Sequence, residues 1–185
     1  IIYLSNPNSP TGFCFSREEI ISLLESTKNI LCIVDEAYYE YADMTVIDLI
    51  EKYENLIVTR TFSKAFSLGA LRLGYAIGAE KNMKELQKAK ELLPESVNKI
   101  AQVAGVAALN DLSYIQKNVA SVKKARKYIA IELTKAGCIV YPSASNFLLV
   151  RFASSQEAVF IKEKLEERGI FLRDSLRSLS IVSMF

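Results

Sequence analysis

Four short apolar runs, each of β-strand length, restrict this chain to a small number of folds. The runs cover residues 1–4, 30–34, 56–59 and 73–77. A helical apolar pattern separates the first two; it begins at a capping box, Ser16 with Glu19, and continues to about Lys28. Strands that alternate with helices form α/β layers around a parallel sheet. We therefore predict an α/β fold with a mainly parallel sheet in the first half of the chain.

The second half of the chain has a different pattern. The predicted elements are helices at residues 81–93, 97–109 and 112–133, short strands at 139–141 and 146–151, a helix from Ser154 to about Arg168, and a final short run at 170–172. Pro94 separates the first two helices, Asn110 or Asp111 can cap the third, and Gly137 can end it. We predict two parts: a first domain at residues 1–110, and residues 111–185, which comprise a long linking helix and a small α+β C-terminal domain.

The composition excludes several classes of function. The chain has no histidine, which rules out histidine-based zinc sites and Ser-His-Asp triads within it. Its net charge of +2 is spread evenly, so we predict no nucleic-acid partner. No apolar run approaches the roughly 20 residues that span a bilayer, so we predict no membrane partner. Three widely spaced cysteines, an odd number, favour a reducing compartment such as the cytoplasm.

Polar residues with chemical potential follow two of the predicted strands. Asp35 comes directly after the apolar run at 30–34, and Ser63-Lys64 follows the run at 56–59. In α/β sheets, ligands bind beyond the carboxyl ends of the strands, so these side chains are expected to converge. A carboxylate beside an apolar core needs a cationic partner, and a protonated pyridine nitrogen would be one. A helix cap, or an ion pair with arginine or lysine, is the alternative interpretation of Asp35.

The residues around Lys64 add to this candidate site. Its neighbours include Phe62 and Phe66, an apolar setting that favours a nucleophilic amine, although an isolated lysine is usually a surface residue. Arg72 could hold a phosphate together with Ser63, by a charge-assisted pair and a hydroxyl hydrogen bond. The alternative is that Arg72 only precedes the next strand. Likewise, Tyr38 could reach the same ligand as Asp35 or could simply pack.

Three motifs occur in order along the chain: Asn-Pro-Asn-Ser-Pro-Thr-Gly at 6–12, Asp-Glu-Ala-Tyr at 35–38, and Ser-Lys-Ala-Phe-Ser-Leu-Gly-Ala-Leu-Arg-Leu-Gly-Tyr at 63–75. Their order and spacing resemble the fold-type I aminotransferases that depend on pyridoxal 5'-phosphate (PLP). Residues 143–147 are similar to a small-domain signature of this group. The Ser-Lys-Ala-Phe run and residues 169–174 most resemble the histidinol-phosphate aminotransferases. The resemblance covers nearly the whole chain and implies that residues 1–110 are part of a large PLP-binding domain.

The resemblance also implies a role for each candidate residue. Lys64 would carry PLP as a Schiff base and move a proton during the reaction. Asp35 would pair with the pyridine nitrogen, and Tyr38 would hydrogen-bond the 3′-oxygen of the ring. Ser63 and Arg72 would bind the phosphate of the cofactor.

One cofactor contact and the substrate-binding residues match the family less closely. The resemblance implies that Arg173 binds the anionic end of the substrate. The family usually has asparagine directly before Pro-Thr-Gly, where it hydrogen-bonds the 3′-oxygen of the cofactor. This chain has Ser9 there, so the resemblance implies that this cofactor contact is weakened, mediated by water, or made by Asn8 instead. Ser180 stands where the family has an arginine for the substrate carboxylate, and Arg177 is three residues out of register.

The function that the resemblance implies is amino-group transfer in amino-acid biosynthesis. A cytoplasmic homodimer would move the group from a small-molecule donor, with histidinol phosphate as the best single expectation, to a 2-oxo acid. The alternatives are a PLP-dependent decarboxylase of the threonine-phosphate type, a non-catalytic PLP-binding regulator domain, and a non-catalytic fragment. The chain begins without methionine inside a strand-like run. We therefore expect it to be part of a longer protein, with little or no activity alone.

Overall fold

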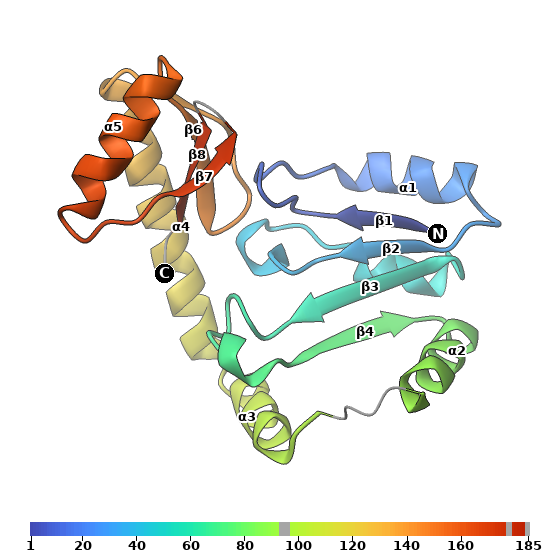
Figure 1. The fold of residues 1–185 in the computed structure, drawn as a ribbon. Helices are drawn as coiled ribbons and strands as arrows, with labels where there is room; N and C mark the ends of the chain where they lie inside the picture. The colour runs from blue at the N-terminus through green and yellow to red at the C-terminus, as the bar shows by residue number, and fades with distance from the viewer. Residues whose placement is uncertain (93–96, 177–178, 184–185) are drawn as a thin grey trace.

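The computed structural model describes residues 1–92, 97–176 and 179–183, which form two sheets with helices around them (Figure 1). Sheet A has the order β1-β2-β3-β4 and sheet B the order β5-β6-β8-β7. The strands are β1 Ile2–Ser5, β2 Cys32–Asp35, β3 Leu56–Thr61, β4 Gly74–Gly78, β5 Ile139–Val140, β6 Phe147–Arg151, β7 Arg173–Leu176 and β8 Leu179–Ser183. The mixed α/β fold with a mainly parallel sheet is confirmed.

Five α-helices and three short 3₁₀ helices connect these strands in the described residues. They are α1 Arg17–Ser26, α2 Glu80–Glu91, α3 Lys99–Asn110, α4 Leu112–Lys135 and α5 Ser155–Glu166, with η1 Tyr39–Tyr41, η2 Ile47–Glu51 and η3 Gly69–Leu71. The capping box at Ser16 forms as predicted, and Asp111 rather than Asn110 caps α4. Pro94 lies outside the described residues. Within them, no helix combines the length and the apolar character needed to cross a membrane.

The candidate site residues of sheet A lie at one edge of the sheet. Strands β1, β2 and β3 are parallel, and β4 runs antiparallel to β3. The carboxyl ends of the three parallel strands therefore point the same way, toward sheet B (Figure 1). This arrangement places Asp35, the last residue of β2, level with Thr59 of β3, which is two residues before the end of that strand; the loop that follows β3 carries Lys64.

One face of sheet A carries a well-packed core. Helix α1 contributes Ile20 and Leu24 to a buried cluster with residues of β2 and β3, among them Cys32 and Val34. The continuous apolar run at 30–34 predicts a strand buried on both faces, and this prediction is wrong. Ile33 points to the opposite face and is only half-buried, because this cluster lies on one side of the sheet.

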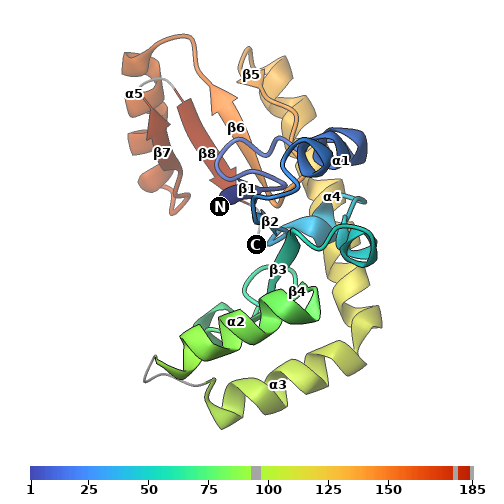
Figure 2. The same ribbon diagram turned by 90° about the vertical axis from the view of Figure 1, so that its right-hand side faces the viewer.

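Sheet B packs against α4 and α5 to form the second unit (Figure 2). Alternate residues of β6 and β8 face two different clusters. Val150 lies in the cluster beside α5, whereas Leu149 and Ile181 lie in the cluster that contains Tyr38. Ser180 pairs with Val150 and is buried, with no hydrogen-bond partner for its Oγ among the described residues. An arginine at position 180 would therefore point into the core, so matching Ser180 to a substrate-binding arginine does not fit this structure; Arg177 lies outside the described residues.

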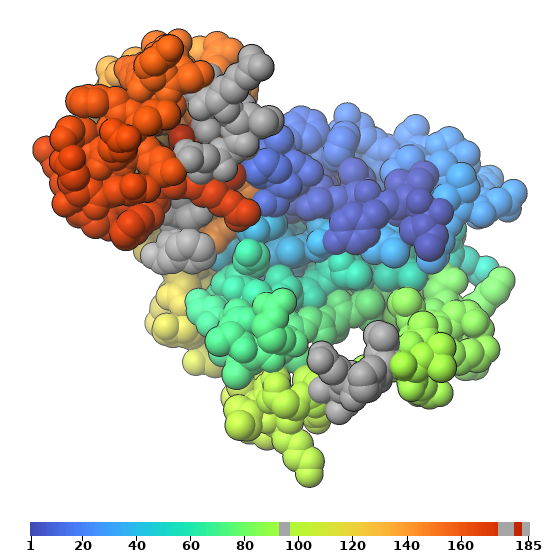
Figure 3. All heavy atoms as spheres, in the orientation of Figure 1, coloured from blue at the N-terminus to red at the C-terminus, as the bar shows by residue number. Residues whose placement is uncertain are grey.

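The two units share a core. A buried cluster joins aromatic residues that follow β2 and β3 to α4 and sheet B; its members are Tyr38, Tyr41, Phe62, Ala65, Phe66, Ile115, Val119, Phe147, Leu149 and Ile181. The space-filling view shows the two units side by side, blue to green for sheet A and orange to red for sheet B (Figure 3). The proposed domain boundary after residue 110 falls between α3 and α4, and it remains a proposal.

A second contact fixes the loop at residues 6–12 against the second unit. Ala144 N donates to Gly12 O at 2.8 Å. Gly12 has φ +74, and a Cβ added there would lie 2.3 Å from Ser143 Oγ. Only glycine fits this position without strain, because it needs both a left-handed backbone and room for the Ser143 side chain.

Candidate active site

A pocket lies at the carboxyl ends of the parallel strands, where the sequence predicts a site. Its lining residues are Asp35, Ala37, Thr59, Arg60, Thr61, Ser63, Lys64, Arg72, Leu73 and Gly74. Four of the predicted site residues thus line one pocket, although they are spread over 38 positions of the chain: Asp35, Ser63, Lys64 and Arg72. This convergence follows from the shared direction of β2 and β3 and from the return of the chain into β4.

Lys64 and Tyr38 lie together at the boundary between the units. The Lys64 Nζ lies 5.1 Å from the centroid of the Tyr38 ring. The Tyr38 ring is buried and packs edge-to-face on Phe147 of β6, with 5.4 Å between ring centroids. The position of Tyr38 beside the amine thus depends on sheet B as well as on sheet A.

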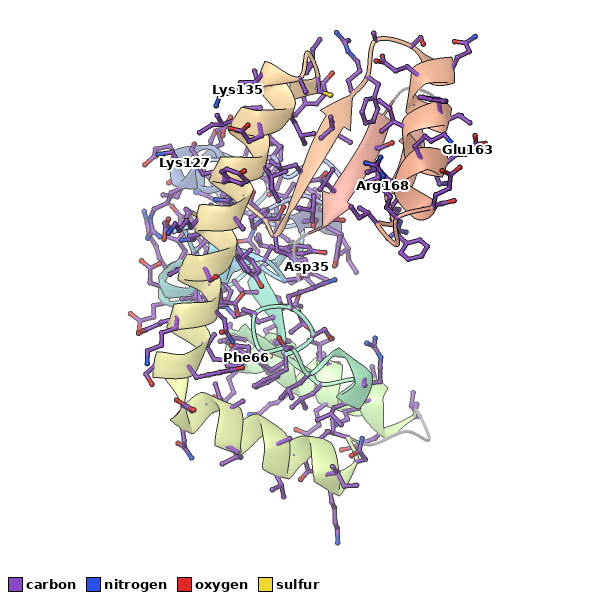
Figure 4. The ribbon with its side chains drawn as sticks, turned by 90° about the vertical axis from the view of Figure 1, so that its left-hand side faces the viewer. Asp35, Phe66, Lys127, Lys135, Glu163 and Arg168 are labelled. Carbon is purple, nitrogen blue, oxygen red and sulfur yellow. The ribbon has the colours of Figure 1, made fainter. Side chains whose placement is uncertain are left out.

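Asp35 lies at the edge of sheet A below sheet B (Figure 4). Its Oδ1 accepts a hydrogen bond from Ala37 N at 3.0 Å, and its Oδ2 accepts one from the Tyr3 hydroxyl of β1. Among the described residues, no lysine or arginine forms a salt bridge with Asp35. The carboxylate is therefore held in place by neutral donors and still lacks a cationic partner. The sequence reasoning missed Tyr3, whose only signal was its position inside an apolar strand.

The loop between β3 and β4 shapes the rest of the pocket. Ser63 N donates to Thr61 Oγ1 at 3.0 Å, which fixes the start of the loop. Ser67 and Arg72 both have left-handed backbones, with φ +56 and +53. Arg72 then donates from Nη1 to Gly69 O at 3.1 Å, and its side chain stays exposed. The loop therefore holds one guanidinium at the pocket, with donors still available for an anion.

The other predicted site residues do not line this pocket. Asn8 Oδ1 accepts from Thr11 Oγ1 at 2.7 Å, so this side chain stabilises its own loop. Ser9 is exposed in the same loop, and Arg173 is an exposed first residue of β7. Their assignment to cofactor and substrate remains a proposal.

A buried ion pair borders the pocket through Arg60, one of the lining residues. Glu36 is 1% exposed, and its Oε2 lies 2.8 Å from Arg60 Nη2. Glu36 Oε1 also accepts hydrogen bonds from Thr45 Oγ1 and Val46 N, and Arg60 stacks over the Tyr39 ring at 3.5 Å. The network joins β2 and β3 to the segment after η1. The sequence shows only an acidic residue next to Asp35, which does not predict a partner 24 positions away.

Glu40 gives a testable pH dependence. Its Oε2 is buried without a hydrogen-bond partner in the described structure, and burial raises the pKa of this carboxyl to about 7, against 4.5 ordinarily. The folded protein therefore holds the proton more tightly than the unfolded chain, and this stabilisation is lost as the pH rises from 4.5 through 7. We expect Glu40→Gln to be more stable than the wild type at pH 8, by roughly 3 kcal/mol at most, and similar to it at pH 4.5. Urea unfolding at both pH values measures this, and parallel pH profiles would contradict it.

A comparison with known protein families shows which family the chain belongs to. The family described as aminotransferase class I and II matches residues 1–178. The chain therefore belongs to the class I and II aminotransferases.

Particular relatives include a histidinol-phosphate aminotransferase of Thermoanaerobacter pseudethanolicus, 41% identical over 94% of this chain and 48% of that protein. A dihydroxyacetone phosphate transaminase of Campylobacter jejuni is 40% identical over 94% of the chain and 47% of that protein. The crystal structure of a histidinol-phosphate aminotransferase from Sinorhizobium meliloti, in complex with pyridoxal-5'-phosphate, has a TM-score of 0.86 at 27% identity and covers 98% of this chain and 52% of that one. The chain thus spans about half the length of the curated relatives it matches.

Proposed function

We propose that the protein is a PLP-dependent aminotransferase of the histidinol-phosphate type. The observation that carries the proposal is a group of three side chains around one pocket at the carboxyl edge of a parallel sheet: a lysine, a carboxylate with no salt-bridge partner among the described residues, and an exposed guanidinium. Relatives named histidinol-phosphate aminotransferase, near 40% identity, support the same function. The chain spans 48% of each of these two relatives.

The residues of the pocket fit PLP chemically. Asp35 lacks a cationic partner in the described structure, and a protonated pyridine nitrogen supplies one. Arg72 and the Ser63 hydroxyl would hold the phosphate by a charge-assisted pair and a hydrogen bond. Tyr38 lies beside the lysine and would hydrogen-bond the ring oxygen. When bound, PLP supplies an electron sink for the carbon that carries the amino group.

Each residue around the pocket would have a separate role in the reaction. Lys64 Nζ would hold the cofactor covalently and, once its amine is free, would accept the proton from the substrate carbon and deliver it to the cofactor. The edge-to-face contact of Tyr38 with Phe147 keeps the phenol beside this amine. Asp35 would keep the pyridine nitrogen charged, and its own position is fixed by the hydrogen bond from Ala37 N.

Binding of PLP to Lys64 tests the proposal directly. The intact protein should develop a visible absorbance band when PLP is added. After borohydride reduction, peptide mapping should find the added mass on Lys64. If no band appears and Lys64 stays unmodified, the cofactor assignment is wrong.

A decarboxylase is the second candidate, because an L-threonine-O-3-phosphate decarboxylase from Porphyromonas gingivalis has a TM-score of 0.83 to this chain at 25% identity. The two reactions are separated by incubating the protein with histidinol phosphate and 2-oxoglutarate, or with threonine phosphate alone. Amino-group transfer supports the first function, and release of CO2 supports the second.

The three free cysteines fit a cytoplasmic location, which we include in the proposal.

The proposed enzyme is a homodimer, and α3 is the surface that favours this. The inner face of α3 has small residues, with Ala101 fully buried and Gly105 close to Leu73 and Phe62. Its large apolar residues point outward; their exposed fractions are 74% for Ile100, 72% for Val103, 62% for Val106 and 46% for Leu109. This distribution is the reverse of that in an ordinary surface helix. Helix α3 lies far from sheet B, where a second copy can reach it (Figures 1 and 2).

Charge on this face should separate the proposed dimer. We expect Val103→Glu combined with Val106→Glu to convert the protein to a monomer, because carboxylates would be buried in an apolar interface. Light scattering coupled to size exclusion measures the mass. Val159→Glu, on an exposed position of α5, is the matched control and should remain dimeric. A wild-type protein that is monomeric at micromolar concentration would contradict the proposal.

A further inference from the structure

Tyr3 makes a contact that the proposed roles do not explain. It lies in β1, on the face of sheet A that the α1 core leaves open, and it is 61% exposed. Its register partner is Ile33, and the next residue on that face of β2 is Asp35. The long side chain of Tyr3 follows the sheet diagonally, and its hydroxyl donates to Asp35 Oδ2.

This contact completes the support of the Asp35 carboxylate. Oδ1 is already fixed by Ala37 N, so the hydroxyl of Tyr3 fixes the second oxygen. With both oxygens engaged, the carboxylate plane cannot turn without breaking a hydrogen bond. Each oxygen keeps a further lone pair, because a carboxylate accepts about four hydrogen bonds. The group can therefore accept a hydrogen bond from a cationic ligand while it stays in this orientation.

The Tyr3 hydroxyl is well suited to donate a hydrogen bond to Asp35. Two effects raise the pKa of the Tyr3 hydroxyl to about 12: partial burial, which is the larger, and the hydrogen bond to Asp35. The hydroxyl is thus protonated, and able to donate, at neutral pH. Phenylalanine would keep the ring on the open face and remove only the donor.

We propose that Tyr3 is a positioning residue, which holds the Asp35 carboxylate toward the pyridine nitrogen of the cofactor. The inference rests on the proposed function, since it requires that PLP binds beside Asp35. Tyr3 itself acts through Asp35 and makes no contact with the reacting atoms. Its loss should appear in cofactor affinity, since the freed carboxylate must be ordered again whenever PLP binds.

The test is a double-mutant cycle on PLP affinity in the intact protein. The visible band of the bound cofactor gives the dissociation constant for wild type, Tyr3→Phe, Asp35→Asn and the double variant. We expect Tyr3→Phe to weaken PLP binding by roughly threefold to tenfold, the range of the net contribution of one typical hydrogen bond. In the Asp35→Asn background, Tyr3→Phe should change nothing, because the group it positions is gone. Tyr128→Phe, at an exposed position of α4, is the control.

The outcomes separate this inference from the proposed function. If wild type binds PLP at Lys64 but Tyr3→Phe binds it equally well, the positioning role is wrong and the proposed function stands. Equal losses in both backgrounds would mean that Tyr3 acts independently of Asp35, which also overturns the role. If wild type shows no PLP band, both proposals fail. Matching urea unfolding curves for wild type and Tyr3→Phe would show that the loss is not a folding defect.

Discussion

Lys64→Ala should lower the transamination rate by roughly 10²–10⁴-fold or more, the range that a positioned proton-transfer group contributes. The same change removes the amine that binds the cofactor covalently, so the visible band should be lost as well. Lys64 lies in the loop between β3 and β4, half-buried, with its Nζ facing the Tyr38 ring. The measurement is the steady-state rate of amino-group transfer to 2-oxoglutarate by the intact protein.

The matched control for this variant is Lys124→Ala, which removes an exposed lysine from α4. It should retain the full rate, because Lys124 lies outside the pocket that Lys64 lines. A Lys64→Ala protein that still transfers amino groups at the wild-type rate would show that the assigned role is wrong, even if PLP binds. Urea unfolding of both variants checks that the loss is chemical.

Arg60→Ala should lower the free energy of unfolding by about 3–5 kcal/mol, the cost of breaking a buried ion pair from one side. The Glu36 carboxylate would stay buried without its cation, and the stacking over Tyr39 would be lost too. Because the pair links β2 to β3, the weakened region includes the strand that ends in Asp35. Urea unfolding at neutral pH measures the change.

The control for Arg60 is Lys88→Ala on α2, which removes one partner of an exposed ion pair with Glu85. Exposed pairs contribute between about 0 and 1 kcal/mol, so this variant should unfold almost as the wild type does. If the two variants lost equal stability, the burial of the Glu36–Arg60 pair would have no energetic consequence. That result would contradict the structure of the network.

Much of the fold could be predicted because the apolar pattern and the end signals agree. The long helix α4 follows from its repeat of apolar residues, and its limits follow from Asp111 and from Gly137, which has φ +91. The convergence of Asp35 and Lys64 could be predicted for a different reason. Parallel strands place their carboxyl ends at one edge, so the position of a residue after a strand is sufficient.

Contacts between distant strands could not be predicted in this way. The hydrogen bond from Tyr3 to Asp35 depends on the register of β1 with β2, and an apolar run contains no information about register. The inward direction of Ser180 likewise depends on its pairing with Val150. To predict the Glu36–Arg60 pair, one would need to know that the ends of two neighbouring strands place these side chains against each other. Each of these features belongs to tertiary structure, and a linear pattern carries no signal for it.

The core that the two units share has a consequence for protein engineering. Ile115 and Val119 of α4 pack on the same cluster as Phe66, while Phe147 of sheet B packs on Tyr38. A chain cut between α3 and α4 would expose apolar surface on both products. Neither piece would be a self-sufficient module for fusion or exchange with a homologue. Recombination within the family should therefore exchange α4 and sheet B together with the segments that contain Tyr38 and Phe66, so that the two sides of this core are inherited as a set.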